Sequence, residues 1–207
     1  RAALDKNGVV VTATLLEVRD LDVYKGPRQL LTGLNLTVTT GSLMQLAGGN
    51  GVGKTSLLRA FAGLARIEVF GHLSRCDDVL YSGHAPALKG TMSPRQNLRT
   101  HPAGLCSPSD SELDKALAAV NMTGYEDALT ARLSAGQQRR VALARLFLPS
   151  ARLWLLDEPF TALDVAGVRG LENRFREHAD DGGAVIFTSH QRADLGERLE
   201  VLDLESY

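Results

Sequence analysis

The sequence is short of cysteine, has no long apolar run and carries no excess of charge of either sign. Its two cysteines, Cys76 and Cys106, lie far apart, without a CxxC pair or a histidine at metal-ligand spacing. We interpret them as reduced thiols of a reducing compartment rather than as a disulfide or a metal site. No apolar run approaches the roughly 18 residues that a membrane span requires, so we expect no span within this chain.

The charge balance and the beginning of the chain exclude two further classes. A formal net charge of −1 on 207 residues gives no general attraction to nucleic acid or anionic lipid, so we expect no nucleic-acid partner. The start at Arg1 contains nothing like the apolar block of a signal peptide. Hydrophobic residues at 44% and charged residues at 23% describe an ordinary globular protein. This length fits one compact domain with room for a small inserted lobe.

Short apolar segments alternate with helical ones along most of the chain. Residues 34–41 and 43–48 are typical of strands, and residues 54–64 of a helix. The same alternation returns with apolar strands at 152–157 and 184–190. Alternating strands and helices predict an α/β fold with a mainly parallel sheet. The amino-terminal region is more purely β, and we expect it to form an antiparallel flap on that sheet.

The middle of the chain differs from both ends. Four prolines break residues 84–132 into short segments, and one good helix stands among them, with Ser109 and Glu112 spaced as a capping box. This stretch predicts a small helical insert. We expect a single domain over residues 1–207, and we assign residues 14–83 and 150–207 to the core and residues 84–149 to a helical subdomain.

A phosphate-binding loop stands out at "GGNGVGKT", residues 48–55, between a predicted strand and a predicted helix. Its glycines let consecutive backbone N–H groups face phosphates, while Lys54 adds a charge and Thr55 a hydroxyl for Mg²⁺. The alternative, a glycine-rich turn that only caps a helix, does not explain the lysine and threonine at their fixed places. We therefore predict that a nucleoside triphosphate is bound by Gly48, Gly49, Asn50, Gly51, Val52, Gly53, Lys54, Thr55 and Ser56.

Two acids follow a buried strand in "LWLLDEP" and supply the second half of such a site. Asp157 is the candidate ligand of Mg²⁺, and Glu158 is the candidate base for the attacking water. The alternative is that both acids merely cap a strand before the turn at Pro159. His190 ends another apolar strand, where sheets of this class gather their ligands, which favours contact with the γ-phosphate over a structural role.

A second polar helix start lies in "RLSAGQQRRVALARL", residues 132–146. Ser134 is a natural N-cap, and Gly136 and Gln137 leave free backbone N–H groups in the first turn, as in a phosphate-binding helix start. One nucleotide needs only one such loop. We therefore expect this surface to serve the nucleotide of another copy in a two-fold dimer, although simple capping gives the same pattern.

Five motifs in this order make the chain similar to the ATP-binding cassette (ABC) ATPases. They are the loop at 48–55, "LSAGQ" at 133–137, "LWLLDE" at 153–158, "TALD" at 161–164, and His190. The resemblance implies the ABC ATPase fold, ATP and Mg²⁺ as ligands, and a signature motif, here with Ala135 replacing a glycine, that closes over the γ-phosphate of the opposite subunit. It also implies that Tyr24 stacks on adenine, unless it is only a surface tyrosine, and that Asp164 lies at the dimer seam.

Within that family, "SGHAPALK", "LLDEPFTALDVAGV" and "TSHQ" resemble the ATPase subunits of the cytochrome c maturation system, the so-called heme exporter. The resemblance implies release or export of heme or a heme-loaded chaperone through membrane-spanning partner subunits. It places the chain peripherally, at the cytoplasmic face of the inner membrane. His84 stands where most cassettes have the Q-loop glutamine, and we count it among the catalytic candidates. Residues 64–83 look shortened, with little room for a full β-hairpin.

Three alternatives remain beside this interpretation. The ATPase subunit of another ABC transporter would share every catalytic residue, and the surface around residues 84–105 would discriminate. A soluble ABC ATPase of assembly or repair is disfavoured by the single cassette and the absence of basic or coiled-coil extensions. A binding module without catalysis is disfavoured by the intact Glu158 and His190.

Overall fold

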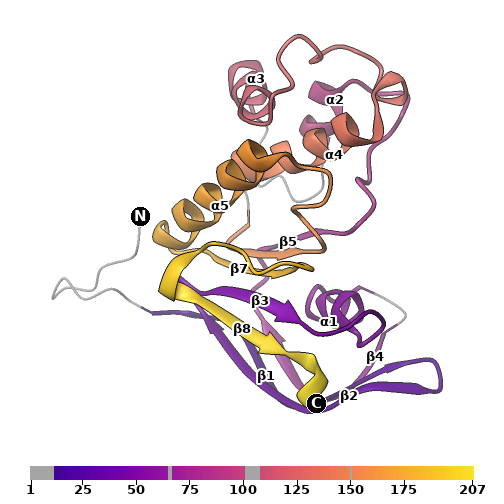
Figure 1. Ribbon diagram of the computed structural model, residues 1–207, viewed down its shortest axis with the longest axis vertical. Coiled ribbons are helices and arrows are strands. Elements are labelled where there is room, and N and C mark those ends of the chain that lie inside the picture. Colours follow the sequence, from indigo (N-terminus) through magenta and orange to yellow (C-terminus); the bar gives the residue numbers. More distant parts are fainter. Residues whose placement is uncertain (1–11, 65–66, 101–107, 150) are drawn as a thin grey trace, which may run out of the picture.

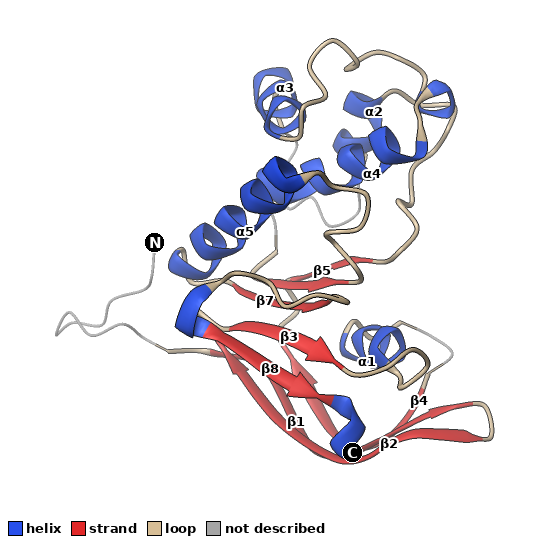
Figure 2. Cartoon of the chain, viewed as in Figure 1, coloured by secondary structure: helices blue, strands red, loops and turns tan. Residues whose placement is uncertain are grey.

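The computed structural model describes residues 12–64, 67–100, 108–149 and 151–207. Its strands and helices follow each other in mixed order along the chain (Figures 1 and 2). The strands are β1 (Thr14–Lys25), β2 (Arg28–Thr39), β3 (Leu43–Ala47), β4 (Glu68–Arg75), β5 (Val79–Ser82), β6 (Leu153–Leu156), β7 (Ala184–Thr188) and β8 (Leu199–Asp203). The helices are α1 (Lys54–Phe61), α2 (Pro94–Arg99), α3 (Asp110–Ala119), α4 (Ala135–Leu143) and α5 (Val165–Asp180), with short 3₁₀ turns η1 (Thr130–Arg132), η2 (Ala144–Phe147), η3 (Gly196–Arg198) and η4 (Leu204–Ser206).

The strands form two sheets. A five-stranded sheet in the order β5-β6-β7-β3-β8 is parallel at every pairing, and a three-stranded sheet in the order β2-β1-β4 is antiparallel. Helix α1 lies between the two sheets, and α5 covers the other face of the parallel sheet (Figure 1). The expected α/β fold, with its mainly parallel sheet and amino-terminal antiparallel flap, is confirmed.

The parallel sheet forms around continuous apolar strands. All residues of β6 and β7 are buried, as strands covered on both faces require. On one face they pack with Phe61 of α1, and on the other with Phe175 of α5. This burial holds the ends of the strands, and the loops that follow them, in fixed positions.

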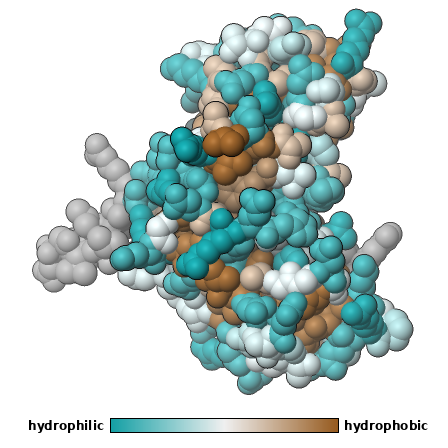
Figure 3. Space-filling view, in the orientation of Figure 1, coloured by the Kyte–Doolittle hydropathy of each residue, from teal (hydrophilic) through white to brown (hydrophobic). Residues whose placement is uncertain are grey.

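The helices α2, α3 and α4 form a separate apolar cluster with Leu98, Leu117 and Val141 in its centre. The expected capping box at Ser109 and Glu112 is present at the start of α3. Helix α2 was missed, because we took prolines only as chain breaks, whereas Pro94 occupies the first turn of the helix, where its missing N–H costs nothing. On the face shown in Figure 3 hydrophilic side chains predominate, with a brown patch near the junction of this cluster and α5.

One further difference from the sequence expectations concerns a strand. Strand β8 was not expected, because its mixed residues show no clean alternation, yet it pairs along its whole length with β3. The described residues of the segment 64–83 form no hairpin of their own, in agreement with the little room expected there: β4 pairs with β1, and β5 joins the parallel sheet.

Cys76 is a free, half-buried thiol, whereas Cys106 lies outside the described residues. No described helix is both long and apolar enough to cross a bilayer.

A buried histidine supports the back of the parallel sheet. The imidazole of His178 lies flat on Trp154, with ring centroids 3.6 Å apart, and its Nε2 is 3.0 Å from the carbonyl oxygen of Arg152. A side chain at Gly183 would collide with that imidazole. Burial lowers the pKa of His178 to about 4 from the ordinary histidine value of about 6.5. The folded protein therefore holds a neutral imidazole that becomes protonated when the chain unfolds in mild acid.

We expect His178 to make stability fall with acidification between pH 6.5 and pH 4. In this window the unfolded chain binds a proton that the folded chain refuses, so up to about 3 kcal/mol of unfolding free energy is lost. Above pH 7 the histidine contributes no pH dependence. Urea unfolding followed by the fluorescence of Trp154 measures this. The variants His178→Phe and His178→Gln should each show a flatter profile than the wild type, and His72→Gln, at an exposed position, should not.

Candidate functional site

The functional candidates come together at one edge of the parallel sheet. The phosphate loop follows β3, His84 follows β5, Asp157 and Glu158 follow β6, and His190 follows β7. Because these strands are parallel, their carboxyl ends meet at the same edge. A cavity of about 460 Å³ lies there, and the predicted residues that line it are Asn50, Gly51, Gly53, Lys54, Thr55, Ser56, His84, Asp157, Glu158 and His190.

The phosphate loop has a backbone that needs its glycines. Gly48, Gly51 and Gly53 have φ of 125°, 84° and 120°, values that other residues rarely adopt. Gly53 is the N-cap of α1 and offers no capping side chain, so the first N–H groups of the helix stay available for an anion. The ammonium group of Lys54 donates to the carbonyl oxygens of Gly48 and Gly49, at 2.6 and 3.0 Å. The lysine is thus held over the loop where phosphate oxygens would arrive.

Asp157 is the buried centre of the site, with 3% of its surface exposed. The hydroxyl of Thr55 donates to both of its carboxylate oxygens, at 3.1 and 3.0 Å, and the hydroxyl of Thr188 donates to one of them at 2.9 Å. A carboxylate beside a hydroxyl supplies hard oxygen ligands of the kind that Mg²⁺ prefers together with substrate phosphates. The donor set therefore fits Mg²⁺, with Thr55 and Asp157 as the residues that would hold it.

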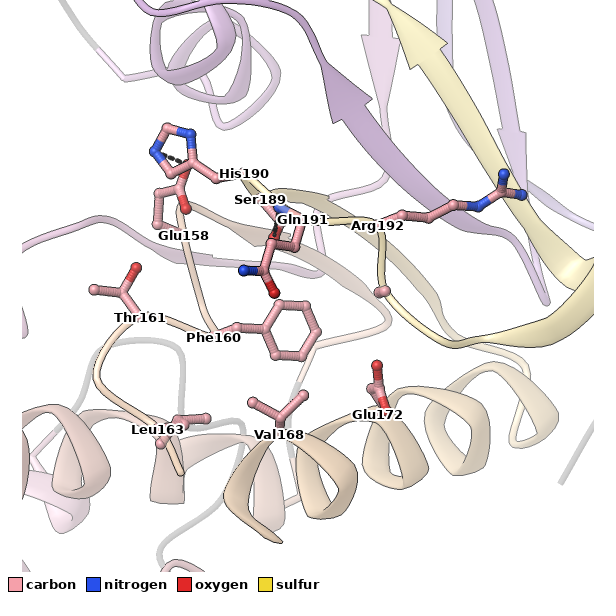
Figure 4. A pocket seen from close by; sticks show the side chains of 11 residues that line it. Glu158, Phe160, Thr161, Leu163, Val168, Glu172, Ser189, His190, Gln191 and Arg192 are labelled. Carbon is pink, nitrogen blue, oxygen red and sulfur yellow. Dashed lines mark hydrogen bonds and ion pairs between the residues drawn. The ribbon is translucent and has the colours of Figure 1, made fainter. Parts of the chain in front are cut away.

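Glu158 and His190 form a pair at the wall of the cavity. Nε2 of His190 lies 3.5 Å from a carboxylate oxygen of Glu158. The backbone N–H of Glu158 donates to the hydroxyl of Thr188 at 2.8 Å, and Glu158 itself has φ of 53°, an uncommon value for a residue with a side chain. Figure 4 shows the two side chains facing each other. Both also line a second hollow, of about 320 Å³, that reaches Phe160 and Glu172. The pair therefore lines both cavities.

Comparison with known proteins agrees with this geometry. A family profile described as ABC transporter matches residues 31–161. The chain is 48% identical over 200 residues to the cytochrome c biogenesis ATP-binding export protein CcmA of Tatumella citrea, covering 91% of this chain and 93% of that protein. The protein of the same name from Methylococcus capsulatus is 43% identical, covering 84% and 90%.

The chain belongs to the ABC transporter family. It binds ATP and is an ATPase of the ABC type. Its fold matches that of a putative ABC transporter ATP-binding protein from Pyrococcus furiosus with a TM-score of 0.78 at 24% identity, covering 95% of this chain and 99% of the other.

Not every candidate lines the cavity of this ABC ATPase. Gly48, Gly49 and Val52 belong to the loop but lie outside the lining, and the side chain of Val52 packs against the core. Tyr24 lies one residue before the lining residue Lys25, and its ring packs edge-on against Phe70, with centroids 5.5 Å apart. Its contact with adenine stays a prediction.

The signature motif lies elsewhere in the molecule. Ser134, Gly136 and Gln137 start α4 in the helical part, outside the cavity lining. The expected N-cap at Ser134 is confirmed, and it forms a capping box in which the side chain of Gln137 accepts the N–H of Ser134 at 2.9 Å. Asp164 caps α5 and lies 3.5 Å from Arg140 of the signature helix. The roles of these residues toward a second nucleotide stay predictions.

Sequence reasoning missed several contributors to the site, among them two basic residues and one acid. Lys25 and Arg28, at the tip of the β1–β2 hairpin, line the cavity and add positive charge to it. Only the basic residues around the turn "KGPR" hinted at them. Glu205, in the turn after β8, accepts the N–H of Gly49 at 2.8 Å. No sequence signal links it to a loop that precedes it by 156 positions.

Replacement of Lys54 by alanine should lower the rate of ATP hydrolysis about a hundredfold or more, and it should weaken triphosphate binding. The site works mainly through electrostatics, and this change removes the ammonium group that the loop holds over its own carbonyls. Turnover and nucleotide affinity are the measurements. The variant Lys115→Ala, on an exposed face of α3, is the control and should behave as the wild type. Near-normal hydrolysis by Lys54→Ala would contradict a catalytic role for residues 48–55.

Proposed function

We propose that this chain is the ATPase subunit of an ABC exporter for cytochrome c biogenesis. The observation that carries the proposal is the 48% identity, over 91% of the chain, to a protein named for that process. The substrate would be heme or a heme-loaded chaperone. Its export or release would be driven by ATP hydrolysis at the edge of the parallel sheet.

The residues around Asp157 support a separate role for each residue during ATP hydrolysis. Lys54 and the backbone N–H groups of its loop would bind the outer phosphates of ATP, and Thr55 with Asp157 would hold Mg²⁺, which would supply further charge neutralisation at those phosphates. Glu158 takes a proton from the attacking water. His190, 3.5 Å from that carboxylate, orients the glutamate and reaches the γ-phosphate.

We propose that the signature motif completes the site of a second ATP-binding subunit. The start of α4 has a Ser134 cap and no acidic residue in its first turn, a combination suited to an anion. It lies away from the nucleotide cavity of its own chain. A two-fold dimer would bring each such start to the partner's nucleotide, and Asp164 would lie at the seam.

Membrane-spanning subunits are the remaining partners in this proposal. The chain would dock on them at the cytoplasmic face of the inner membrane, as a peripheral subunit. The segment that begins at His84 is the candidate coupling element, because it lines the nucleotide cavity and leads directly into the helical part.

The variant Glu158→Gln should bind ATP without turnover, because the amide keeps the shape of the side chain but takes no proton. ATP-loaded dimer should therefore accumulate. Adding Ser134→Arg should abolish that dimer by placing bulk and charge against the partner's nucleotide. Light scattering with ATP measures this, and Thr123→Arg, on an exposed loop, is the matched control. An unchanged dimer in the Glu158→Gln/Ser134→Arg protein would exclude the cross-site role of α4.

In cells, a chromosomal Lys54→Ala substitution should remove holocytochromes c while heme synthesis stays intact, since the energy source of the exporter is lost. Heme staining of membrane proteins and total heme measure the two quantities. Purification of the wild-type protein from native membranes should bring cytochrome c maturation proteins with it. Normal holocytochrome levels in the variant would favour the ATPase subunit of another transporter.

A further inference from the structure

One buried side chain of α4, the helix that begins with the signature motif, reaches the edge of the parallel sheet where the nucleotide cavity lies. Arg139, in the second turn of α4, has 5% of its surface exposed. Its Nη1 donates to the carbonyl oxygens of Gly83 and His84, at 3.1 and 2.9 Å. Its Nη2 donates to those of Asp157 and Glu158, at 3.0 and 2.6 Å. One guanidinium group therefore joins four backbone carbonyls of two different loops.

The two loops are neighbours by topology. Strands β5 and β6 pair in parallel, with Ser82 opposite Leu156, and the N–H of Asp157 donates to the carbonyl of Ser82 at 2.8 Å. Beyond this last backbone hydrogen bond, the segments that follow β5 and β6 are no longer paired as strands. Arg139 bridges the gap that opens between them.

A charge buried in this way is costly unless it is well bonded. Burial lowers the pKa of Arg139, and the negative charges of Asp157 and Glu158 offset part of that effect. The planar fork of the guanidinium suits four acceptors in two directions, which a lysine ammonium group does not match. The arginine therefore holds the geometry of the loops as well as neutralising charge near Asp157.

Glu158 is the residue that depends most on this support. Its φ of 53° costs energy for a residue with a side chain, and such strain persists only where its surroundings impose it. The carbonyl of Glu158 receives its shortest hydrogen bond from Arg139, at 2.6 Å, and a longer one from the N–H of Thr161, at 3.2 Å. Loss of the guanidinium would let this backbone relax and would move the carboxylate.

The same helix also begins the signature motif. Ser134 and Arg139 are five residues apart, about 7.5 Å along the helix axis, within one rigid element. We propose that Arg139 is a positioning residue that fixes the backbones of His84 and Glu158 relative to α4, so that a shift of the signature helix moves both residues. This inference rests on the proposed ATPase site, and it names the link between the signature helix and that site.

Arg145 provides a comparison within the same segment. It is equally buried, with 5% exposed, and donates to the carbonyl oxygens of Pro86 and Ala87, both at 3.2 Å. It therefore holds the same loop further from the nucleotide cavity and, among the described residues, forms no hydrogen bond or ion pair with Glu158. A role in folding alone would make the two arginines equivalent.

The test uses the full chain, with its membrane partners where they copurify, and the variant Arg139→Lys. We expect kcat to fall by roughly tenfold to a hundredfold, because a small displacement of Glu158 is enough to misalign the attacking water. The KM and the affinity for ATP should change by about twofold at most, since the phosphate loop is untouched. In a double-mutant cycle with His84→Gln the losses should be non-additive, because both changes act through one loop.

Three controls separate positioning from stability. Thermal unfolding and the fraction of protein that binds ATP correct each rate for folded material. Arg198→Lys changes a surface arginine, paired with Asp180, and should leave every parameter unchanged. Arg145→Lys should lower the midpoint of unfolding comparably but reduce kcat less than Arg139→Lys does.

Several outcomes would overturn the inference: an unchanged kcat in Arg139→Lys, a loss confined to KM, additive losses in the cycle, or an equal loss of kcat in Arg145→Lys. The assay measures only ATP hydrolysis, so its result does not depend on which cargo is exported. Failure of the proposed function would instead appear in the wild-type protein, as absent hydrolysis or as copurified partners of another transporter.

Discussion

The carboxylate of Asp157 holds the catalytic edge together. It is buried and accepts hydroxyl hydrogen bonds from Thr55 at the start of α1 and from Thr188 at the end of β7. Three elements that are distant in sequence are thereby fixed to one another within hydrogen-bond length. The parallel sheet makes this possible, because β3, β6 and β7 all deliver their following loops to the same edge.

Near Asp157, buried strands are followed by loop residues with a strained backbone. Strands β6 and β7 are buried and, apart from Thr188, apolar, whereas the segment that follows β6 adopts uncommon backbone conformations, with φ of 53° at Glu158 and 63° at Ala162. Such strain is tolerated where neighbouring bonds over-determine the loop. Here the neighbouring bonds come from Thr188 on the sheet and from Arg139 on the signature helix. The parallel sheet and the signature helix thus both hold the backbone of Glu158 in place.

Much of the fold and of the site was predictable from particular residues. The apolar runs of β6 and β7 predicted buried parallel strands, and the glycines and Lys54 predicted the phosphate loop. Local rules failed where pairing decides the structure: β8 has a mixed pattern and forms because β3 lies beside it. They also failed at α2, where the proline that begins the helix reads as a break. Lys25, Arg28 and Glu205 were missed, because only tertiary folding brings a hairpin tip and a late turn to the loop at Gly49.

The sequence by itself identified the candidate groups: the glycines, Lys54, Asp157, Glu158 and His190 stand in motifs whose spacing follows from local backbone geometry. Only the tertiary structure decided which groups act on which. Arg139 of the signature helix reaches four carbonyls of the loops after β5 and β6. The sequence does not predict this, because it gives no reason to distinguish Arg139 from its neighbour Arg140. The fold buries the first and leaves the second near the surface, in an ion pair with Asp164. The physical reason is that burial and long-range hydrogen bonds depend on how elements pack, which a local pattern does not specify.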